Sequence, residues 1–461
     1  MTLIKSISGI RGTIGGTPGN NLTPVDAVLF ATAYAETIKE KKSVHKPKIL
    51  LGRDARPSGE MVARAVQAAL MGMGVDIVDL GLTTTPSMEM AVPGLQADGG
   101  IILTASHNPV EWNALKLLDE KGEFISADDG RKIIDKVAKQ SFDYASVHEL
   151  GVLENRPGGY IKEHVEAILR LPEVNTESIK KRGFKVVIDA VNSTGGIAVP
   201  ELLRRLGVDY ECLYCTSDGW FPHNPEPLEQ NLQDIMQAVP RHRADMGIVV
   251  DPDADRLALI DENGRMFGEE YTLVAAADYI LSKKPGPVVS NLSSSRALRD
   301  LADHYGQPYF ASAVGEVNVV KKMKEVKAVI GGEGNGGVIY PGLHYGRDAL
   351  VGIALILSLL AETGLELSEL KKRYPQYYMA KEKIRLEEGM DIDYLLKKIA
   401  GQHKEATINT EDGVKMDFKD YWIHLRKSNT EPIIRIYTEA ESQEKADALA
   451  ERTREELKQL I

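Results

Sequence analysis

A serine and a histidine stand together where an apolar run of the chain gives way to polar residues. Residues 101–103 predict the end of a buried strand, and the proline at position 109 cannot continue a strand ladder. Ser106 and His107 lie between them, and Lys116 follows ten positions after the serine. Because α/β proteins bind ligands at the carboxyl ends of their strands, this order predicts a functional serine on a loop. An ordinary polar turn is the alternative interpretation.

A second strand end carries carboxylates. Residues 246–250 predict a buried strand, after which Asp251, Asp253 and Asp255 follow at alternate positions. Three carboxylates so close together repel one another strongly unless a cation lies among them. Oxygen ligands without a neighbouring histidine or cysteine favour a hard ion, Mg²⁺ before Zn²⁺. Arg256 is then placed to hold an anion that the metal also contacts. A solvated acidic turn is the alternative.

A glycine-rich loop follows a third predicted strand. Residues 331–337 contain five glycines, and the apolar residues 338–341 come next in place of a helix. A dinucleotide site opens a helix directly after its glycines, so this loop does not match one. Glu333 and Asn335 supply the hydrogen-bonding groups, which suit neighbouring hydroxyls of a sugar.

Two other segments carry arginine in turn-like surroundings. The turn after residue 425 offers Arg426, Ser428, Asn429 and Thr430, whose donors together suit a phosphate dianion. Near the N-terminus Arg11 lies between glycines, which allow a backbone to approach a ligand closely. The alternative for each is a plain exposed turn.

The elements that position these loops repeat along the chain. The order strand, helix, strand occurs three times, at residues 49–52, 58–73 and 75–80, at 185–189, 197–206 and 208–214, and at 287–291, 295–305 and 308–310. A right-handed βαβ unit explains each copy, so we expect three related α/β domains. Strands near 421–425 and 433–438 and a helix over 442–460 predict a smaller α+β domain at the C-terminus.

The expected fold class is therefore α/β, with mixed sheets in the first three domains and a C-terminal α+β domain. A chain of 461 residues fits this division, since domains commonly hold roughly 100–200 residues. The expected domains are residues 1–155 with the serine loop, 156–258 with the acidic loop, 259–370 with the glycine-rich loop, and 371–461 with the phosphate loop.

Composition excludes several classes of protein. A net charge of −11 argues against a nucleic-acid binder that works by phosphate neutralisation. No apolar run approaches the roughly 20 residues of a membrane span, and no signal peptide is visible. The two cysteines, Cys212 and Cys215, form no disulfide framework and predict a cytoplasmic setting. A redox dithiol stays possible, but two inert, buried or half-buried thiols on a strand are favoured.

The four loops together indicate phosphoryl transfer on a sugar phosphate, with a metal offsetting charge on the transferred group. They resemble the four signature loops of the α-D-phosphohexomutase superfamily, in the same order and at domain-sized separations. The matching segments are residues 104–109, 251–256, 331–337 and 426–432. The resemblance implies a heart-shaped molecule of four domains around a central cleft, to which each domain contributes one loop.

The resemblance also assigns roles. Ser106 would carry a phosphoryl group, and Mg²⁺ would be held by a phosphoserine oxygen together with Asp251, Asp253 and Asp255. Four residues match those that surround the phosphoserine in the superfamily: Arg11, His107, Lys116 and Arg256. Glu333 and Asn335 match the residues that bind the 3- and 4-hydroxyls of the sugar. The non-reacting phosphate would be bound by Arg426, Ser428, Asn429 and Thr430. The phosphosugar would pass through a hexose 1,6-bisphosphate that turns end for end, with closure of the fourth domain excluding water.

The glycine-rich loop departs from part of that superfamily. Many members end this loop with Ser-Gly-His, whereas this chain has Asn335 followed by two glycines. This form, with Gly346, Arg347 and Asp348 downstream, is most similar to a branch usually called phosphoglucosamine mutase. Members of that branch are also called phosphomannomutase/phosphoglucomutase, so both kinds of sugar stay open. The expected state is a monomer or a homodimer.

Two other functions deserve comparison with the mutase. A phosphatase would use Ser106 with His107, but neighbouring side chains on an extended segment point to opposite faces, and the G-x-S-x-G elbow is absent. A sugar-phosphate sensor without catalysis would have no use for the serine or for three aspartates. Both are therefore less favoured.

Overall fold

The computed structural model describes residues 2–6, 9–156, 158–386, 390–427 and 433–460. The chain divides into two compact units. The first contains Met1–Thr272 and Gly336–Ser368, and the second contains Leu273–Asn335 and Glu369–Ile461. Among the described helices, none combines the length and the apolar character that a membrane crossing requires.

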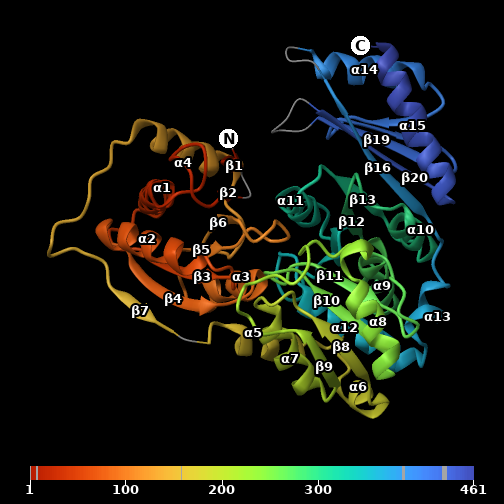
Figure 1. Ribbon diagram of the computed structural model, residues 1–461, viewed down its shortest axis with the longest axis horizontal. Coiled ribbons are helices and arrows are strands. Elements are labelled where there is room, and N and C mark those ends of the chain that lie inside the picture. Colours follow the sequence, from red (N-terminus) through yellow and green to blue (C-terminus); the bar gives the residue numbers. More distant parts are fainter. Residues whose placement is uncertain (1, 7–8, 157, 387–389, 428–432, 461) are drawn as a thin grey trace. The chain divides into compact units, whose positions relative to one another are not determined.

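The first unit begins with a mixed sheet of seven strands in the order β1-β2-β6-β5-β3-β4-β7 (Figure 1). The strands are β1 (Ile4–Ser6), β2 (Gly9–Thr13), β3 (Lys48–Arg53), β4 (Asp76–Leu82), β5 (Gly99–Leu103), β6 (Trp112–Leu118) and β7 (Leu153–Asn155). β3 runs parallel to β4 and β5, while β6 is antiparallel to β5 and β2. The carboxyl ends of β3 and β5 therefore meet at one edge, where the serine loop begins.

Helices cover both faces of this sheet. On one face lie α1 (Pro24–Lys42), α2 (Gly59–Gly72) and α4 (Ala127–Lys139), and on the other lies α3 (Thr85–Gly94). The alternation of side chains along a strand explains the division, because Ile49 and Leu51 pack into the first core and Leu50 into the second. Helix α1 starts with a capping box between Thr23 and Asp26.

A second sheet in the first unit has the order β11-β10-β8-β9. Its strands are β8 (Lys185–Asp189), β9 (Asp209–Tyr214), β10 (Met246–Val250) and β11 (Leu257–Ile260), and the helices around it are α5 (Ile161–Leu169), α6 (Thr176–Arg182), α7 (Gly195–Leu206) and α8 (Gln233–His242), with a 3-10 turn at Glu229–Asn231. Cys212 is exposed and Cys215 is half-buried. The prediction of a buried or half-buried thiol is thus wrong for Cys212, because β9 is an edge strand whose first residues are exposed.

The first unit is completed by β15 (Gly337–Ile339) and α12 (Ala349–Thr363). Helix α12 is apolar on all sides and almost wholly buried. It packs against α5, α6 and α7 (Figure 1). Asp348 is its N-cap, with its side chain accepting from the amides of Leu350 and Val351.

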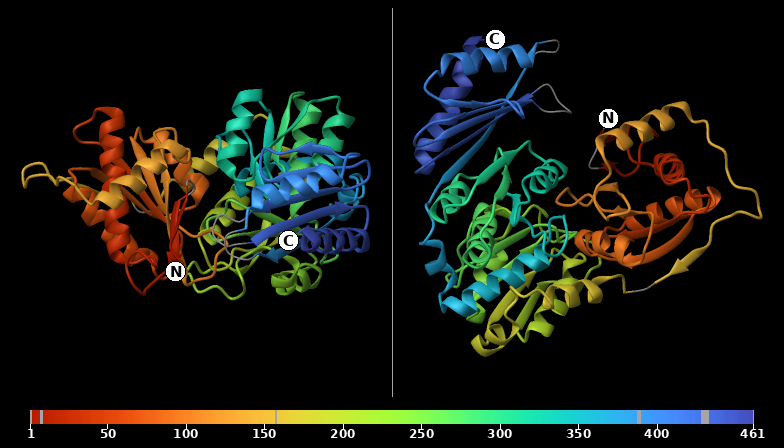
Figure 2. Two further views of the ribbon diagram at one scale, coloured as in Figure 1. Left: turned by 90° about the horizontal axis from the view of Figure 1, so that it is seen from above. Right: turned by 180° about the vertical axis from the view of Figure 1, so that it is seen from behind.

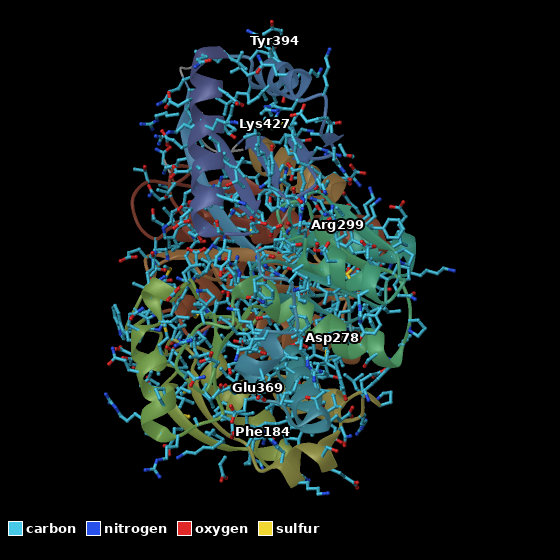
Figure 3. All side chains as sticks on the ribbon, turned by 90° about the vertical axis from the view of Figure 1, so that its right-hand side faces the viewer. Phe184, Asp278, Arg299, Glu369, Tyr394 and Lys427 are labelled. Carbon is cyan, nitrogen blue, oxygen red and sulfur yellow. The ribbon has the colours of Figure 1, made fainter. Side chains whose placement is uncertain are left out.

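The second unit contains a parallel sheet in the order β13-β12-β14. Its elements are β12 (Val288–Asn291), α10 (Ala297–His304), β13 (Tyr309–Ser312), α11 (Glu316–Val326) and β14 (Ile330–Glu333). The helices α9 (Glu269–Lys283) and α13 (Leu367–Lys371) each begin in the first unit and end in the second. Asp278, labelled in Figure 3, accepts hydrogen bonds from the hydroxyls of Tyr305 (2.6 Å) and Tyr374 (2.9 Å). These bonds link α9 to the segment that leads into the C-terminal sheet.

The C-terminal part of the second unit is an antiparallel sheet in the order β16-β20-β19-β18-β17. Its elements are β16 (Tyr378–Arg385), α14 (Ile392–Gln402), β17 (Thr407–Asn409), β18 (Val414–Asp417), β19 (Trp422–Lys427), β20 (Ile433–Ala440) and α15 (Gln443–Leu460). Side chains of α14 and α15 share one core with this sheet, and Figure 2 shows both helices in blue beside it. The expected α+β character of the tail is confirmed.

Candidate active site

Ser106 lies on the loop that connects β5 to β6, as the sequence predicts. Its φ of 48° is in the left-handed region, which a serine occupies only under constraint. The backbone amide of Ser106 donates to Thr104 Oγ1 at 3.0 Å. The residue is only 8% exposed, so the loop holds the serine in one buried orientation.

A buried arginine supports this loop through hydrogen bonds to its backbone. Arg56 follows β3, and its side chain is wholly inaccessible to solvent. Its Nε donates to Asp54 Oδ2 at 3.0 Å, and the same oxygen accepts from Thr104 Oγ1 at 2.7 Å. The remaining donors of Arg56 reach the backbone carbonyls of Ser106, Asn108, Pro109 and Trp112. The planar guanidinium thus fixes the path of the serine loop.

The acidic loop follows β10, and its three carboxylates are completely buried. Ala254 has a φ of 55°, so this loop also contains a strained residue that is not glycine. Thr85, at the start of α3, contacts the loop through two bonds: its amide donates to Asp253 O at 2.9 Å, and its hydroxyl donates to Asp253 Oδ2 at 2.5 Å. Helix α3, which packs on the seven-stranded sheet, therefore holds the acidic loop of the second sheet in place.

The serine and acidic loops meet directly in the first unit. Ser106 Oγ donates to Asp251 Oδ2 at 2.6 Å. Lys116, on β6, places its Nζ 2.7 Å from Asp253 Oδ2 and 3.6 Å from Asp255 Oδ2. The structure therefore brings together, within hydrogen-bonding reach, residues that are more than a hundred positions apart in the sequence.

The pKa values of Asp251 and Asp253 are shifted in opposite directions. Burial and the charges of Asp255 and Asp253 raise the pKa of Asp251 well above its usual value. Burial also acts to raise the pKa of Asp253, but the Lys116 ammonium and hydrogen bonds from Lys116 and Thr85 outweigh it and lower that pKa. The protein alone thus neutralises only part of the negative charge of this cluster.

The donor set fits a divalent cation. Asp253 Oδ1 and Asp255 Oδ1 are buried, and among the described residues neither oxygen has a hydrogen-bond partner. Buried carboxylate oxygens normally find donors, so two without one indicate a missing positive group. The three aspartates can bring one oxygen each to a common point, and all of these ligands are hard oxygens. The triad could therefore bind a metal ion.

His107 lies beside the serine in the folded protein. Its Nδ1 is 3.4 Å from Ser106 Oγ. The expectation that neighbouring side chains would point to opposite faces is therefore wrong, because it assumes an extended backbone and Ser106 is left-handed. Burial lowers the pKa of His107 well below its usual value, and the charges of Arg256, Arg347 and Arg11 lower it further. Arg256 Nε lies 3.9 Å from Asp255 Oδ1, and Arg11 lies on β2, paired with Ala114 of β6.

The remaining predicted site residues belong to the second unit. Glu333 is buried, and its Oε1 accepts from Asn291 Nδ2 at 2.9 Å and from the amide of Gly315 at 3.1 Å. Asn335 is half-buried in the turn after β14. Arg426 donates from Nε to Asp412 Oδ2 at 2.8 Å. Ser428, Asn429 and Thr430 lie outside the described residues.

Sequence reasoning did not identify four residues that hold the site. Asp54 and Arg56 directly follow a predicted strand, and this position at a strand end is a signal that could have revealed them. Thr85 and Arg347 leave no such signal, since their partners lie far away in the chain. Arg347 Nη2 donates to Asp255 Oδ2 at 2.6 Å, across 92 positions.

Four family models match consecutive parts of the chain. They describe phosphoglucomutase/phosphomannomutase alpha/beta/alpha domain I (residues 3–144), domain II (162–264) and domain III (268–378), and the C-terminal domain of the same family (382–456). The matches agree with four domains in the expected order, while the boundaries at residues 155, 258 and 370 stay predictions.

Individual relatives match over nearly the whole chain. A phosphoglucomutase/phosphomannomutase of Thermococcus kodakarensis is 38% identical over 94% of this chain and 95% of its own. A phosphoglucosamine/phosphogalactosamine mutase of Sulfurisphaera tokodaii is 34% identical over 98% of each chain. The crystal structure of a phosphoglucomutase/phosphomannomutase family protein from Burkholderia thailandensis has a TM-score of 0.84 at 26% identity, covering 99% of this chain and 98% of that one. This chain belongs to the phosphoglucomutase/phosphomannomutase family of α-D-phosphohexomutases.

Proposed function

We propose that this phosphohexomutase interconverts the 6-phosphate and 1-phosphate of a hexosamine, with glucosamine phosphate as its preferred substrate. Ser106 carries the phosphoryl group, and a hexosamine 1,6-bisphosphate is the intermediate. The single observation that carries the proposal is the 2.6 Å contact between Ser106 Oγ and Asp251 Oδ2. It joins the serine to a buried acidic triad that fits a divalent cation.

Mg²⁺ is the proposed metal, with Asp251, Asp253 and Asp255 as its protein ligands and a phosphoserine oxygen as a further one. All of the ligand atoms are oxygens, which suits Mg²⁺ better than Zn²⁺. When bound, the ion offsets negative charge on the transferred phosphoryl group. Lys116 and Arg347 contact the triad and keep the carboxylates oriented.

The transfer itself is a displacement at phosphorus. The O1 or O6 hydroxyl of the sugar attacks the phosphorus of phospho-Ser106, the bond from phosphorus to Ser106 Oγ breaks, and the proton of the hydroxyl is lost to a base. His107, whose Nδ1 lies 3.4 Å from Ser106 Oγ, is placed to exchange a proton with the serine oxygen as that oxygen leaves phosphorus or attacks it. After the bisphosphate turns, Ser106 Oγ loses its proton and attacks the other phosphorus. The bond from that phosphorus to the sugar oxygen breaks, the sugar oxygen takes up a proton, and the serine is phosphorylated again.

Residues of the second unit are proposed to bind the substrate. Glu333 and Asn335 would hold the sugar hydroxyls, and Arg426 with Ser428, Asn429 and Thr430 would hold the phosphate that does not react. In the described structure Glu333 Oε1 accepts from Asn291 Nδ2 and from the amide of Gly315, and these bonds orient the carboxylate.

The sugar preference rests on two observations. The glycine-rich loop has Asn335 followed by two glycines, the form typical of the phosphoglucosamine branch. The Sulfurisphaera tokodaii relative is named for glucosamine and galactosamine phosphates. Phosphomannomutase/phosphoglucomutase activity is the second candidate, because the Thermococcus kodakarensis relative carries that name. The cytoplasmic setting and the monomeric or homodimeric state stay predictions of the sequence.

Kinetics on three sugars test the proposal. We expect kcat/KM for glucosamine 1-phosphate to exceed that for glucose 1-phosphate and mannose 1-phosphate by at least about tenfold, a difference of about 1.4 kcal/mol in transition-state binding. Each reaction needs Mg²⁺ and a trace of the matching 1,6-bisphosphate. A higher kcat/KM for glucose or mannose phosphate would establish the second candidate. Release of inorganic phosphate as fast as isomerisation would instead reject the mutase mechanism.

A further inference from the structure

Two imidazoles and a carboxylate lie close together in the first unit, outside the acidic loop. His164 comes from α5, His344 from the turn before α12, and Asp348 is the N-cap of that helix. Asp348 Oδ2 lies 2.9 Å from His164 Nε2 and 3.4 Å from His344 Nε2. His164 and Asp348 are wholly buried, and the side chain of His344 is 13% exposed. The reaction described above uses none of the three.

The separations suit tetrahedral coordination. Bonds of about 2.1 Å from a tetrahedral zinc ion place neighbouring ligand atoms about 3.4 Å apart. The observed distances of 2.9 and 3.4 Å approach that value, and the three ligand atoms all lie within 4.8 Å of one another. Two of the three ligand pairs therefore lie within about half an ångström of tetrahedral spacing, and the third pair lies within 4.8 Å.

A second layer of contacts orients each ligand. His164 Nδ1 lies 2.9 Å from Ser87 Oγ, and His344 Nδ1 lies 3.3 Å from Glu89 Oε2. Histidine ligands of metals usually donate their other ring N–H to such an acceptor, which fixes the ring and leaves Nε2 for the metal. Asp348 Oδ1 accepts from two amides of α12, so its Oδ2 is the oxygen that faces the imidazoles.

We propose that His164, His344 and Asp348 form a second metal site, for Zn²⁺ or a similar borderline ion. Two nitrogens and one oxygen select such an ion over Mg²⁺, in contrast to the oxygen-only triad. With three protein ligands, water or a further carboxylate oxygen completes the coordination shell.

The location suggests a positioning role. Ser87 and Glu89 lie on α3, whose first residue Thr85 donates to Asp253. Arg347 lies between two proposed ligands and donates to Asp255. A metal at this point would hold α3, α5 and the start of α12 together, and it would fix two of the donors that support the acidic loop.

Cobalt is the probe for this site. The full-length protein is freed of metal with a chelator, saturated with Mg²⁺ to occupy the acidic triad, and titrated with Co²⁺ alone. We expect one equivalent of Co²⁺ to bind with the intense visible absorption of a tetrahedral complex, and Zn²⁺ to abolish that absorption. Wild-type protein without a tetrahedral spectrum would overturn the proposal and leave an ion pair of histidines and carboxylates.

Variants assign the spectrum to these residues. His344→Asn should bind Co²⁺ at least about tenfold more weakly, and Glu89→Gln, which keeps every ligand, should weaken it by a smaller factor. His223→Asn is the matched control, because His223 pairs with Asp189 in the same unit but outside the cluster. Equal Co²⁺ affinity in wild type, His344→Asn and Glu89→Gln would reject the assignment, even if the wild-type spectrum appeared.

Discussion

In the proposed reaction Ser106 loses and regains a phosphoryl group, and its surroundings suit both steps. The Oγ atom contacts Asp251 on one side and lies near His107 on the other. The left-handed backbone of Ser106 brings these two groups to the same oxygen, which an extended backbone would not do. Sequence reasoning predicted the serine and the aspartates but could not predict this local geometry.

Removal of the carrier hydroxyl is the first prediction at the residue scale. Ser106→Ala should lower kcat by about 10³ or more, because the variant lacks the oxygen that accepts and returns the phosphoryl group. Intact-protein mass after incubation with glucose 1,6-bisphosphate should show a phosphoryl group on the wild type and none on the variant. Ser146→Ala, which changes an exposed serine, is the control and should leave both measurements unchanged. Near-normal turnover in Ser106→Ala would rule out the carrier role.

Lys415 supports a prediction about pH. It is buried, its Nζ donates to Leu292 O at 2.7 Å, and burial lowers its pKa to about 8 from an ordinary 10.5. Asp417 and Glu439 favour its charged form, while Arg299 and Arg296 oppose it. Below pH 8 the lysine is protonated in both folded and unfolded chains, so folding bears the full cost of burying the charge. The stability of the protein should therefore rise, by on the order of 3 kcal/mol from this residue, as pH increases from 8 to 10.5.

Denaturant unfolding at several pH values measures this effect. Lys415→Met removes the titrating group, so its free energy of unfolding should increase less between pH 8 and 10 than that of the wild type. Lys427→Met provides the control, because Lys427 is half-exposed and pairs with the exposed Asp393. Parallel pH profiles for Lys415→Met and wild type would contradict the prediction.

At the scale of elements, Arg56 connects the seven-stranded sheet to the loop that carries Ser106. The side chain lies beneath the serine loop and joins the end of β3 to four carbonyls of that loop. Strands and helices could be predicted from the sequence because apolar runs and turn residues are local signals. The carbonyls that Arg56 contacts lie about fifty positions away in the sequence, and no local pattern in the sequence indicates which carbonyls these are.

Arg56→Lys is the corresponding prediction. Lysine keeps the charge but cannot make the same planar set of bonds, so buried carbonyls lose their donor. We expect a loss of about 2 kcal/mol or more in the free energy of unfolding, together with a lower kcat because the serine loop moves. Arg64→Lys, on the exposed face of α2, should change stability by less than about 0.5 kcal/mol. Similar values for the two variants would show that the loop does not depend on Arg56.

At the scale of the whole molecule, the order of the four loops along the chain was predictable, whereas the contacts between the serine and acidic loops were not. The βαβ repeats at residues 49–80 and 185–214 indicate two separate sheets, and the structure confirms both. The prediction failed where burial depends on neighbours from elsewhere, as for Cys212 on its exposed edge strand. It also missed the cluster of His164, His344 and Asp348, whose members are up to 184 positions apart.

The contacts of the acidic loop have a consequence for synthesis on the ribosome. Chains are made from the N-terminus, and domains generally fold as they emerge. The serine loop and Thr85 are therefore available when Asp253 leaves the exit tunnel, but Arg347, the partner of Asp255, is still to be made. A nascent chain that ends after β11 holds its three aspartates with one of their cationic partners absent. The acidic loop reaches its final electrostatic state only when the start of α12 has been translated and docked.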